Sequence, residues 1–240
     1  MLTERQIKLI EAIINEYINT SEPVGSVELV DRYNLKFSAA TVRNEMARLI
    51  EMGFLQMLHA SSGRVPTKSA YRFYLTDLMD EEEIPVLQEV AMKQRLWPSR
   101  YQFERLLKDA AIALSEMTNY LVIASTSDGY ITNAGASNVL ENREFWDIDA
   151  AKAALQLLDD RELFENILSS VPQTTEVKCL IEDEIGIEKL ANCAIVYADY
   201  KTPNKSGNIA VLGPSRMRYH QVVPDVRYTK SVIEELGGAW

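Results

Sequence analysis

The amino-acid sequence predicts an α+β protein in which a winged helix-turn-helix domain precedes an antiparallel α+β domain. In residues 1–80 the text reads as three helices, a short β-hairpin and a further helix, which is the element order of a winged helix. After residue 118, strands and helices do not strictly alternate, which favours an antiparallel sheet over a doubly wound parallel one. We therefore expect domains at 1–80 and 119–240, joined by a helical linker region at 81–118.

Capping residues and hydrophobic spacing mark the first three helices. The segment Thr3–Gln6 matches a capping box and is followed by isoleucines at the helical repeat. Ser26 is expected to cap a short second helix, and Ser38 a third. Gly53 stands just beyond the third helix, where glycine commonly ends a helix because it tolerates the left-handed conformation.

A β-hairpin and a fourth helix complete the N-terminal domain. The letters "FLQML" read as a strand, "HASSG" as a polar turn and "RVP" as the returning strand. Thr67 then begins a helix with aromatic residues at helical spacing, Tyr71, Phe73 and Tyr74. We expect these rings to belong to the core, the alternative being a platform on which bases stack.

The remaining chain mixes helical and strand-like text without internal repeats. We expect helices on both sides of Pro98 and helical text from Asp149 onward, and a C-terminal helix that is interrupted by Pro224. Strands are expected in five segments, 120–126, 130–135, 176–182, 192–200 and 208–213.

Composition limits the class of protein. The chain is 47% hydrophobic and 25% charged, which is ordinary for a globular protein. No apolar run is long enough to cross a bilayer and the N-terminus does not resemble a signal peptide, so we expect a cytoplasmic protein with no membrane association. Cys179 and Cys193 lack metal-ligand spacing and are expected to be small buried side chains, the alternative being a redox switch.

The sequence predicts no catalytic residues, metal site or cofactor. His59 and His220 have no cysteine or carboxylate at ligand spacing, and Ser61 and Ser62 lack a general base, so an enzyme is not expected. The letters "LGPSRM" could form an anion site, but a structural turn in which Pro214 starts the next segment is favoured.

Charge is unevenly distributed along the chain. The net charge is −10, from 25 basic and 35 acidic residues. Residues 1–31 contain two Lys or Arg and six acidic residues, whereas residues 36–76 contain six Lys or Arg and two acidic residues. A local basic region on an acidic protein indicates a specific nucleic-acid contact more than general affinity.

The third predicted helix has an apolar face and an opposite face of small, amide and basic side chains. Val42, Met46, Leu49 and Ile50 fall on the core side. On the other side, alanine lets the backbone approach a groove, while arginine and asparagine match guanine and adenine edges. The alternative is an ordinary solvated helix face. The DNA-binding residues expected from this helix and its cap are Ser38, Ala40, Thr41, Arg43, Asn44, Ala47 and Arg48.

The hairpin tip has chemistry that matches this face. Its hydroxyls, backbone N–H groups and arginine suit contact with phosphates or with the minor groove. The DNA-binding residues expected from the wing and the start of the next helix are His59, Ser61, Ser62, Arg64, Thr67 and Lys68.

Two runs of the N-terminal half, "SAATVRNEMARLIEMGFL" and "HASSGRVPTKSAYRFYLTDLM", resemble the HrcA heat-inducible transcription repressors of bacteria. "IGIEKLANCAIVYADY" and "GNIAVLGPSRMRY" are similar to the regulatory domain of that family. The resemblance implies a GAF-like second domain and a homodimer that represses chaperone operons at an inverted-repeat DNA operator. It also implies a chaperonin as modulator and no cofactor for DNA binding.

The sequence departs from the family pattern in its middle. The family has a long segment with an inserted dimerisation module between two stretches of this text. Here "NYLVIASTSDGYITNAGASNVL" runs almost directly from one stretch to the other. Two alternatives stay open. One is a winged-helix regulator whose GAF-like domain senses a small molecule, and the other is a regulator that has lost DNA binding.

Overall fold

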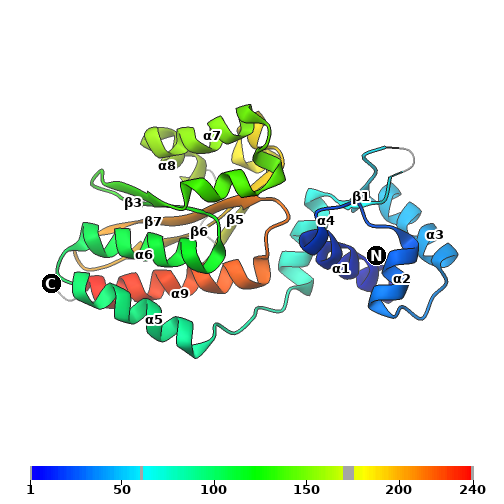
Figure 1. Cartoon of the computed structure of the whole chain (residues 1–240), viewed down its shortest axis with the longest axis horizontal. Helices are drawn as coiled ribbons and strands as arrows, with labels where there is room; N and C mark the ends of the chain where they lie inside the picture. The colour runs from blue at the N-terminus through cyan, green and yellow to red at the C-terminus, as the bar shows by residue number, and fades with distance from the viewer. Residues whose placement is uncertain (1, 60–61, 170–175, 239–240) are drawn as a thin grey trace. The chain divides into compact units, whose positions relative to one another are not determined.

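The computed structural model describes residues 2–59, 62–169 and 176–238. The chain divides into two compact units, residues 1–80 and 81–240 (Figure 1). The predicted contact residue Ser61 lies outside the described residues. Within the described ranges, no helix is both long and apolar enough to cross a membrane.

The first unit has the order of elements that the sequence predicts. Its elements are α1 Glu4–Thr20, α2 Ser26–Tyr33, α3 Ala39–Glu51, β1 Leu55–Gln56, β2 Val65–Pro66, α4 Lys68–Phe73 and the π-helical turn η1 Tyr74–Leu78. The capping box of Thr3 with Gln6 is present at α1. Ser38 caps α3, and Gly53 follows that helix with φ +80°, so the local signals at these ends are confirmed.

The core of this unit lies between α3 and the first two helices. Val42, Met46 and Leu49 are buried, as are Ile10 and Leu29 on α1 and α2, and α3 contacts both helices. The orientation predicted for α3 is therefore confirmed. Tyr71 and Tyr74 are also buried, and this identifies them as core residues.

One predicted cap is wrong. Helix α2 begins at Ser26 itself, and Gly25 occupies the N-cap position without a side-chain hydrogen bond. The reason lies outside the helix. Val24 is bridged to Arg64 of the hairpin by two backbone hydrogen bonds of 2.9 Å, which holds the chain extended up to Gly25.

The second unit is built on a five-stranded sheet. Its strands are β3 Leu121–Thr126, β4 Ile131–Ala134, β5 Lys178–Ile181, β6 Cys193–Lys201 and β7 Ser206–Pro214. They lie in the order β4-β3-β7-β6-β5 and every neighbouring pair is antiparallel. The antiparallel α+β prediction is therefore confirmed.

Helices cover both faces of this sheet (Figure 1). The longer helices are α5 Val86–Leu96, α6 Phe103–Thr118, α7 Ile148–Asp159, α8 Arg161–Ser169 and α9 Tyr219–Gly237. Short 3₁₀ turns are η2 Trp97–Ser99, η3 Ala136–Glu141, η4 Arg143–Phe145, η5 Glu182–Ile185 and η6 Glu188–Leu190. Helices α6 and α9 pack on one face, and α7 and α8 share a hydrophobic core with the other. Residues 81–118, expected as a linker region, thus belong to the second unit.

The C-terminal helix continues through Pro224, so its predicted interruption is wrong. Pro224 has no N–H to donate to the carbonyl of His220, one turn earlier. The backbone N–H of Glu82 donates to that carbonyl instead, at 2.9 Å. The segment that enters the second unit therefore satisfies the group that proline leaves free.

The structure also shows the environment of the two cysteines and of the "LGPSRM" motif. Cys193 is fully buried, as predicted, and burial raises the pKa of its thiol. Cys179 is only partly buried, which differs from the prediction, and the two cysteines are not joined in a disulfide. In "LGPSRM", the Arg216 guanidinium is bound to Glu144 at 2.7 and 3.1 Å, and a turn follows Pro214. The predicted structural turn is confirmed, but Pro214 ends β7 and does not start the next segment.

Candidate nucleic-acid interface

The outer face of α3 is exposed as the sequence predicts. Ala40, Arg43, Asn44, Ala47 and Arg48 are all exposed. Neither Arg43 nor Asn44 forms a side-chain hydrogen bond or ion pair with any residue that the structure describes. Their donors and acceptors are therefore available to an external ligand.

The start of α3 is held by its cap. The backbone N–H of Thr41 donates to Ser38 Oγ at 3.2 Å, and the two hydroxyl oxygens lie 3.0 Å apart. This arrangement satisfies one of the free N–H groups of the first turn. The positive end of the helix dipole is exposed beside Arg43, which favours anionic groups there.

Arg48 differs from Arg43 because it is already paired inside the unit. Its Nη1 donates to Glu45 Oε1 at 3.2 Å. Glu45 is buried and also accepts from Gln6 Nε2 at 3.1 Å, while Arg5 lies 3.7 Å away. The cluster ties α3 to α1. Sequence reasoning missed it, since only the Glu45–Arg48 spacing is a local signal.

The hairpin turn is closed by Ser62. Its Oγ donates to the His59 carbonyl at 2.8 Å and accepts from the His59 backbone N–H at 3.0 Å. The Arg64 side chain folds back, with Nη1 donating to the Ser62 carbonyl at 2.8 Å. These contacts hold the wing in shape and leave His59 exposed at its end.

The base of the wing is anchored at two places. A Cβ on Gly63 would lie 2.4 Å from the Pro23 carbonyl oxygen, so only glycine allows this close approach. Just beyond β2, Thr67 Oγ1 donates to the Gly53 carbonyl at 2.6 Å, joining the wing to the end of α3. Lys68 is half-buried at the start of α4.

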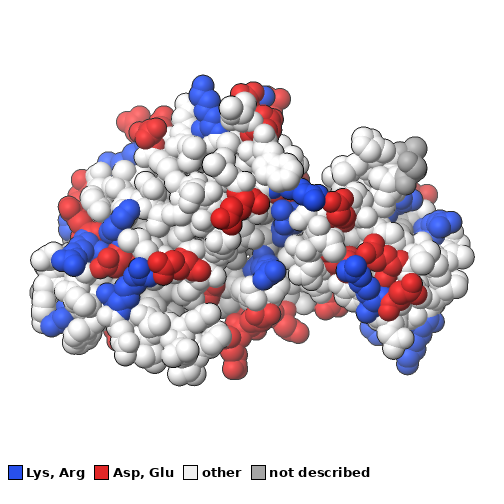
Figure 2. All heavy atoms as spheres, viewed as in Figure 1, with Lys and Arg blue, Asp and Glu red and all other residues white. Residues whose placement is uncertain are grey.

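The predicted contact residues therefore come from three segments of one unit: the α3 face, the wing and the wing–α4 junction. On the face of the molecule shown in Figure 2, acidic and basic side chains are interspersed, and no large patch of one sign dominates. Contact with a polyanion would then rest on a few positioned side chains more than on a general basic surface.

A winged helix with an exposed α3 face, attached to a separate α+β unit, places the chain in the class of winged-helix transcriptional regulators. The family model "HrcA protein C terminal domain" matches residues 124–223. The chain is similar to the HrcA family over this range, and its curated relatives are named as transcription repressors.

The curated relatives match between 59% and 98% of this chain. "Heat-inducible transcription repressor HrcA" of Acetivibrio thermocellus is 24% identical over 98% of this chain and 96% of the relative. The protein of the same name from Clostridium acetobutylicum is 41% identical over 59% of this chain and 42% of the relative. A solved structure described as a hypothetical protein has a TM-score of 0.80 at 18% identity, covering 100% of this chain and 99% of that one, and supports the fold alone.

The alignment with the Acetivibrio protein is longer than this chain. It runs over 336 positions, while this chain has 240 residues. At least 336 − 240 = 96 positions of the relative therefore have no counterpart here. A chain shorter than this relative is what the departure from the family pattern predicts.

Proposed function

We propose that this protein represses transcription of chaperone operons by binding an inverted-repeat operator as a homodimer. The observation that carries the proposal is the exposed α3 face, where Arg43 and Asn44 have no partner among the described residues and are flanked by alanines. Such a repressor acts where the chromosome lies, and we therefore place it in the cytoplasm.

In this proposal α3 is the helix that enters the major groove. Arg43 offers paired donors to a guanine edge, and Asn44 a donor and an acceptor to an adenine edge. Both lie near the N-terminus of α3, the part of a recognition helix that contacts bases. Ala40 and Ala47 keep the backbone close to the groove, and exposed His59 of the wing approaches the phosphates.

Arg48, Arg64 and Thr67 take supporting roles in this proposal. Each uses its side chain within the unit: Arg48 on Glu45, Arg64 on Ser62 and Thr67 on Gly53. We propose that they set the position of the reading face and the wing, with only their remaining donors left for phosphates.

The homodimer would form through the second unit, which we propose to be GAF-like. Without the family insert, the dimer needs another apolar surface. Around α5, Leu87 is 80% exposed, and Trp97 and Tyr101 are more than half exposed with the Arg100 guanidinium 4.4 and 4.3 Å from their ring centres. Aromatic and arginine side chains are enriched at protein interfaces, so this surface is our candidate. A chaperonin is the proposed modulator, by family resemblance.

A mobility-shift titration on a short inverted-repeat duplex, with the mass of the complex measured by light scattering, tests the proposal. We expect two chains per duplex and much weaker binding to a scrambled duplex. Leu87→Glu should reduce dimerisation, whereas Glu104→Ala, on the exposed side of α6, serves as a surface control. A monomer both free and on the operator would contradict the dimer, and equal affinity for both duplexes would contradict the repressor.

A further inference from the structure

A polar cavity of about 520 Å³ lies on the α7/α8 side of the sheet in the second unit. Elsewhere this face is apolar: Ile123, Ala210 and Tyr197 pair across β3, β7 and β6 and belong to the hydrophobic core. Two residues further along the strands, a row of polar side chains replaces them. This polar row consists of Ser125, Asn208 and Asp199, which are direct partners across the same three strands.

Ser125 is the least satisfied member of the polar row. Its side chain is 1% exposed, and its Oγ has no hydrogen-bond partner among the described residues. Leaving a buried hydroxyl unpaired costs free energy, and a protein keeps such a group where a ligand or water pairs with it. By strand alternation Ser125 shares the face of Leu121 and Ile123, and it lines the cavity.

A buried cation lies at the other end of the cavity. The Lys178 side chain is 5% exposed, and its Nζ donates to Asp199 Oδ2 at 2.5 Å and lies 5.3 Å from the centre of the Tyr197 ring. Tyr197 in turn donates its hydroxyl to the Leu168 carbonyl of α8 at 2.7 Å, which fixes the helix over the cavity. The ammonium is therefore held in place before any ligand arrives.

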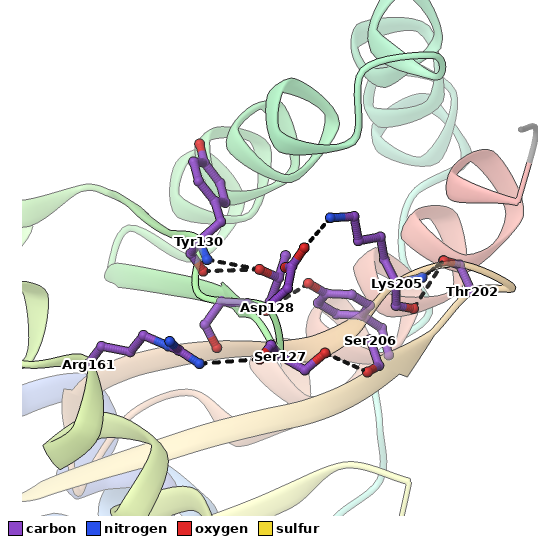
Figure 3. Close-up of polar contacts among 10 residues, drawn as sticks. Ser127, Asp128, Tyr130, Arg161, Thr202, Lys205 and Ser206 are labelled. Atoms are coloured by element: carbon purple, nitrogen blue, oxygen red, sulfur yellow. Dashed lines mark hydrogen bonds and ion pairs between the residues drawn. The ribbon is translucent and has the colours of Figure 1, made fainter.

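The mouth of the cavity is fixed by two loops (Figure 3). The Arg161 guanidinium, from α8, donates to the Ser127 carbonyl at 3.4 Å, and the Ser127 and Ser206 hydroxyls lie 3.0 Å apart. Lys205 is paired with Asp128 between the same two turns. The β3–β4 and β6–β7 turns are thus joined beside the cavity.

The lining favours a ligand rich in oxygen and negative charge. Arg161 and Lys178 are neutralised by Glu165 and Asp199, but the Lys201 side chain forms no ion pair with the described residues and leaves one positive charge in excess. Serine hydroxyls supply further donors, and the size lies within the range of small-molecule sites. We propose that this cavity binds a small organic anion that carries hydroxyl groups beside its carboxylate or phosphate.

This inference is independent of DNA binding and is tested on the full chain by calorimetric titration. The probes are citrate and glucose 6-phosphate, with glucose as the neutral control. We expect at least one anion to bind saturably at one site per chain, and glucose not to bind. Ser125→Ala should weaken that binding about tenfold, the equivalent of one hydrogen bond, and Lys201→Met should weaken it as well.

Two controls separate a binding site from a structural defect. Ser231→Ala changes an exposed hydroxyl that bonds only within α9, and it should leave the titration unchanged. Ser125→Ala should unfold at the same temperature as the parent chain or higher, because it removes an unpaired buried hydroxyl. A lower unfolding temperature, no binding of either anion, or equal binding by Ser125→Ala would each overturn the proposal.

Discussion

The anchoring of the wing depends on Gly63, and replacing it with alanine is a sharp test of the structure. A Cβ there would lie 2.4 Å from the Pro23 carbonyl oxygen and 2.7 Å from the Val24 nitrogen, both of them backbone atoms. Neither can move aside as a side chain could. The hairpin must therefore shift, and the two 2.9 Å hydrogen bonds between Val24 and Arg64 would be lost or stretched.

The free-energy cost of Gly63→Ala can be estimated either from the hydrogen bonds that are lost or from the overpacking that the new Cβ causes. Two backbone hydrogen bonds contribute about 1 kcal/mol each, and overpacking of a tight site costs about 1–3 kcal/mol. We expect Gly63→Ala to destabilise the bridge by about 2–3 kcal/mol. Hydrogen exchange at the Val24 and Arg64 amides should then accelerate about 30- to 150-fold.

Gly25→Ala is the matched control for this experiment. A Cβ on Gly25 meets nothing within 4 Å, and its φ of −92° suits any residue. Its exchange rates at Val24 and Arg64 should stay near those of the parent chain. If Gly63→Ala keeps both amides protected and binds operator normally, the wing is not held by this bridge and the reasoning fails.

Three further predictions follow from burial, exposure and ionisation. Leu49→Ala should lower the free energy of unfolding by about 2–5 kcal/mol, because Leu49 is buried. Exposed Ala47→Ser should change that free energy by less than about 0.5 kcal/mol and yet weaken operator binding. Thermal melts that rank the two variants the other way would contradict the orientation of α3. Arg43→Ala should reduce the preference for operator over scrambled DNA by about 1–3 kcal/mol. Lys68→Ala should weaken binding to both duplexes and reduce the slope of log K against log salt by about 0.9. An unchanged preference in Arg43→Ala would mean that α3 does not contact the bases of the operator. Burial, with a smaller effect from the Glu82 carboxylate, raises the pKa of Asp225 from 3.8 to about 6, so its contribution to stability is greatest below pH 3.8 and is lost as the pH rises through 6. In urea melts between pH 4 and 7, Asp225→Asn should remove this fall in the free energy of unfolding. An unchanged pH profile in the variant would refute the assignment to Asp225.

Much of the first unit follows from local signals in the sequence. The cap at Ser38, the spacing of Val42, Met46 and Leu49, and the glycine beyond α3 each depend on residues within a few positions of one another. Such signals act through backbone geometry and helical period, which need no distant partner. They were sufficient to predict the element order and the exposed face that carries Arg43. The antiparallel sheet followed from the order of strand-like text in the same way.

Other features were decided only when distant segments met. Pro224 breaks a helix by its local chemistry, yet α9 continues because Glu82 supplies the missing donor. The burial of Glu45 depends on Gln6, 39 positions away.

The polar cavity is likewise formed by segments that are distant in the sequence. Nothing local distinguishes Ser125 from any serine in a strand, because its neighbours in the polar row come from β6 and β7. Hydrophobic period and capping are properties of a single segment, so the sequence by itself determines the segments and their faces. The pairing of buried polar groups depends on which segments become neighbours, and for this protein the tertiary structure alone decided it.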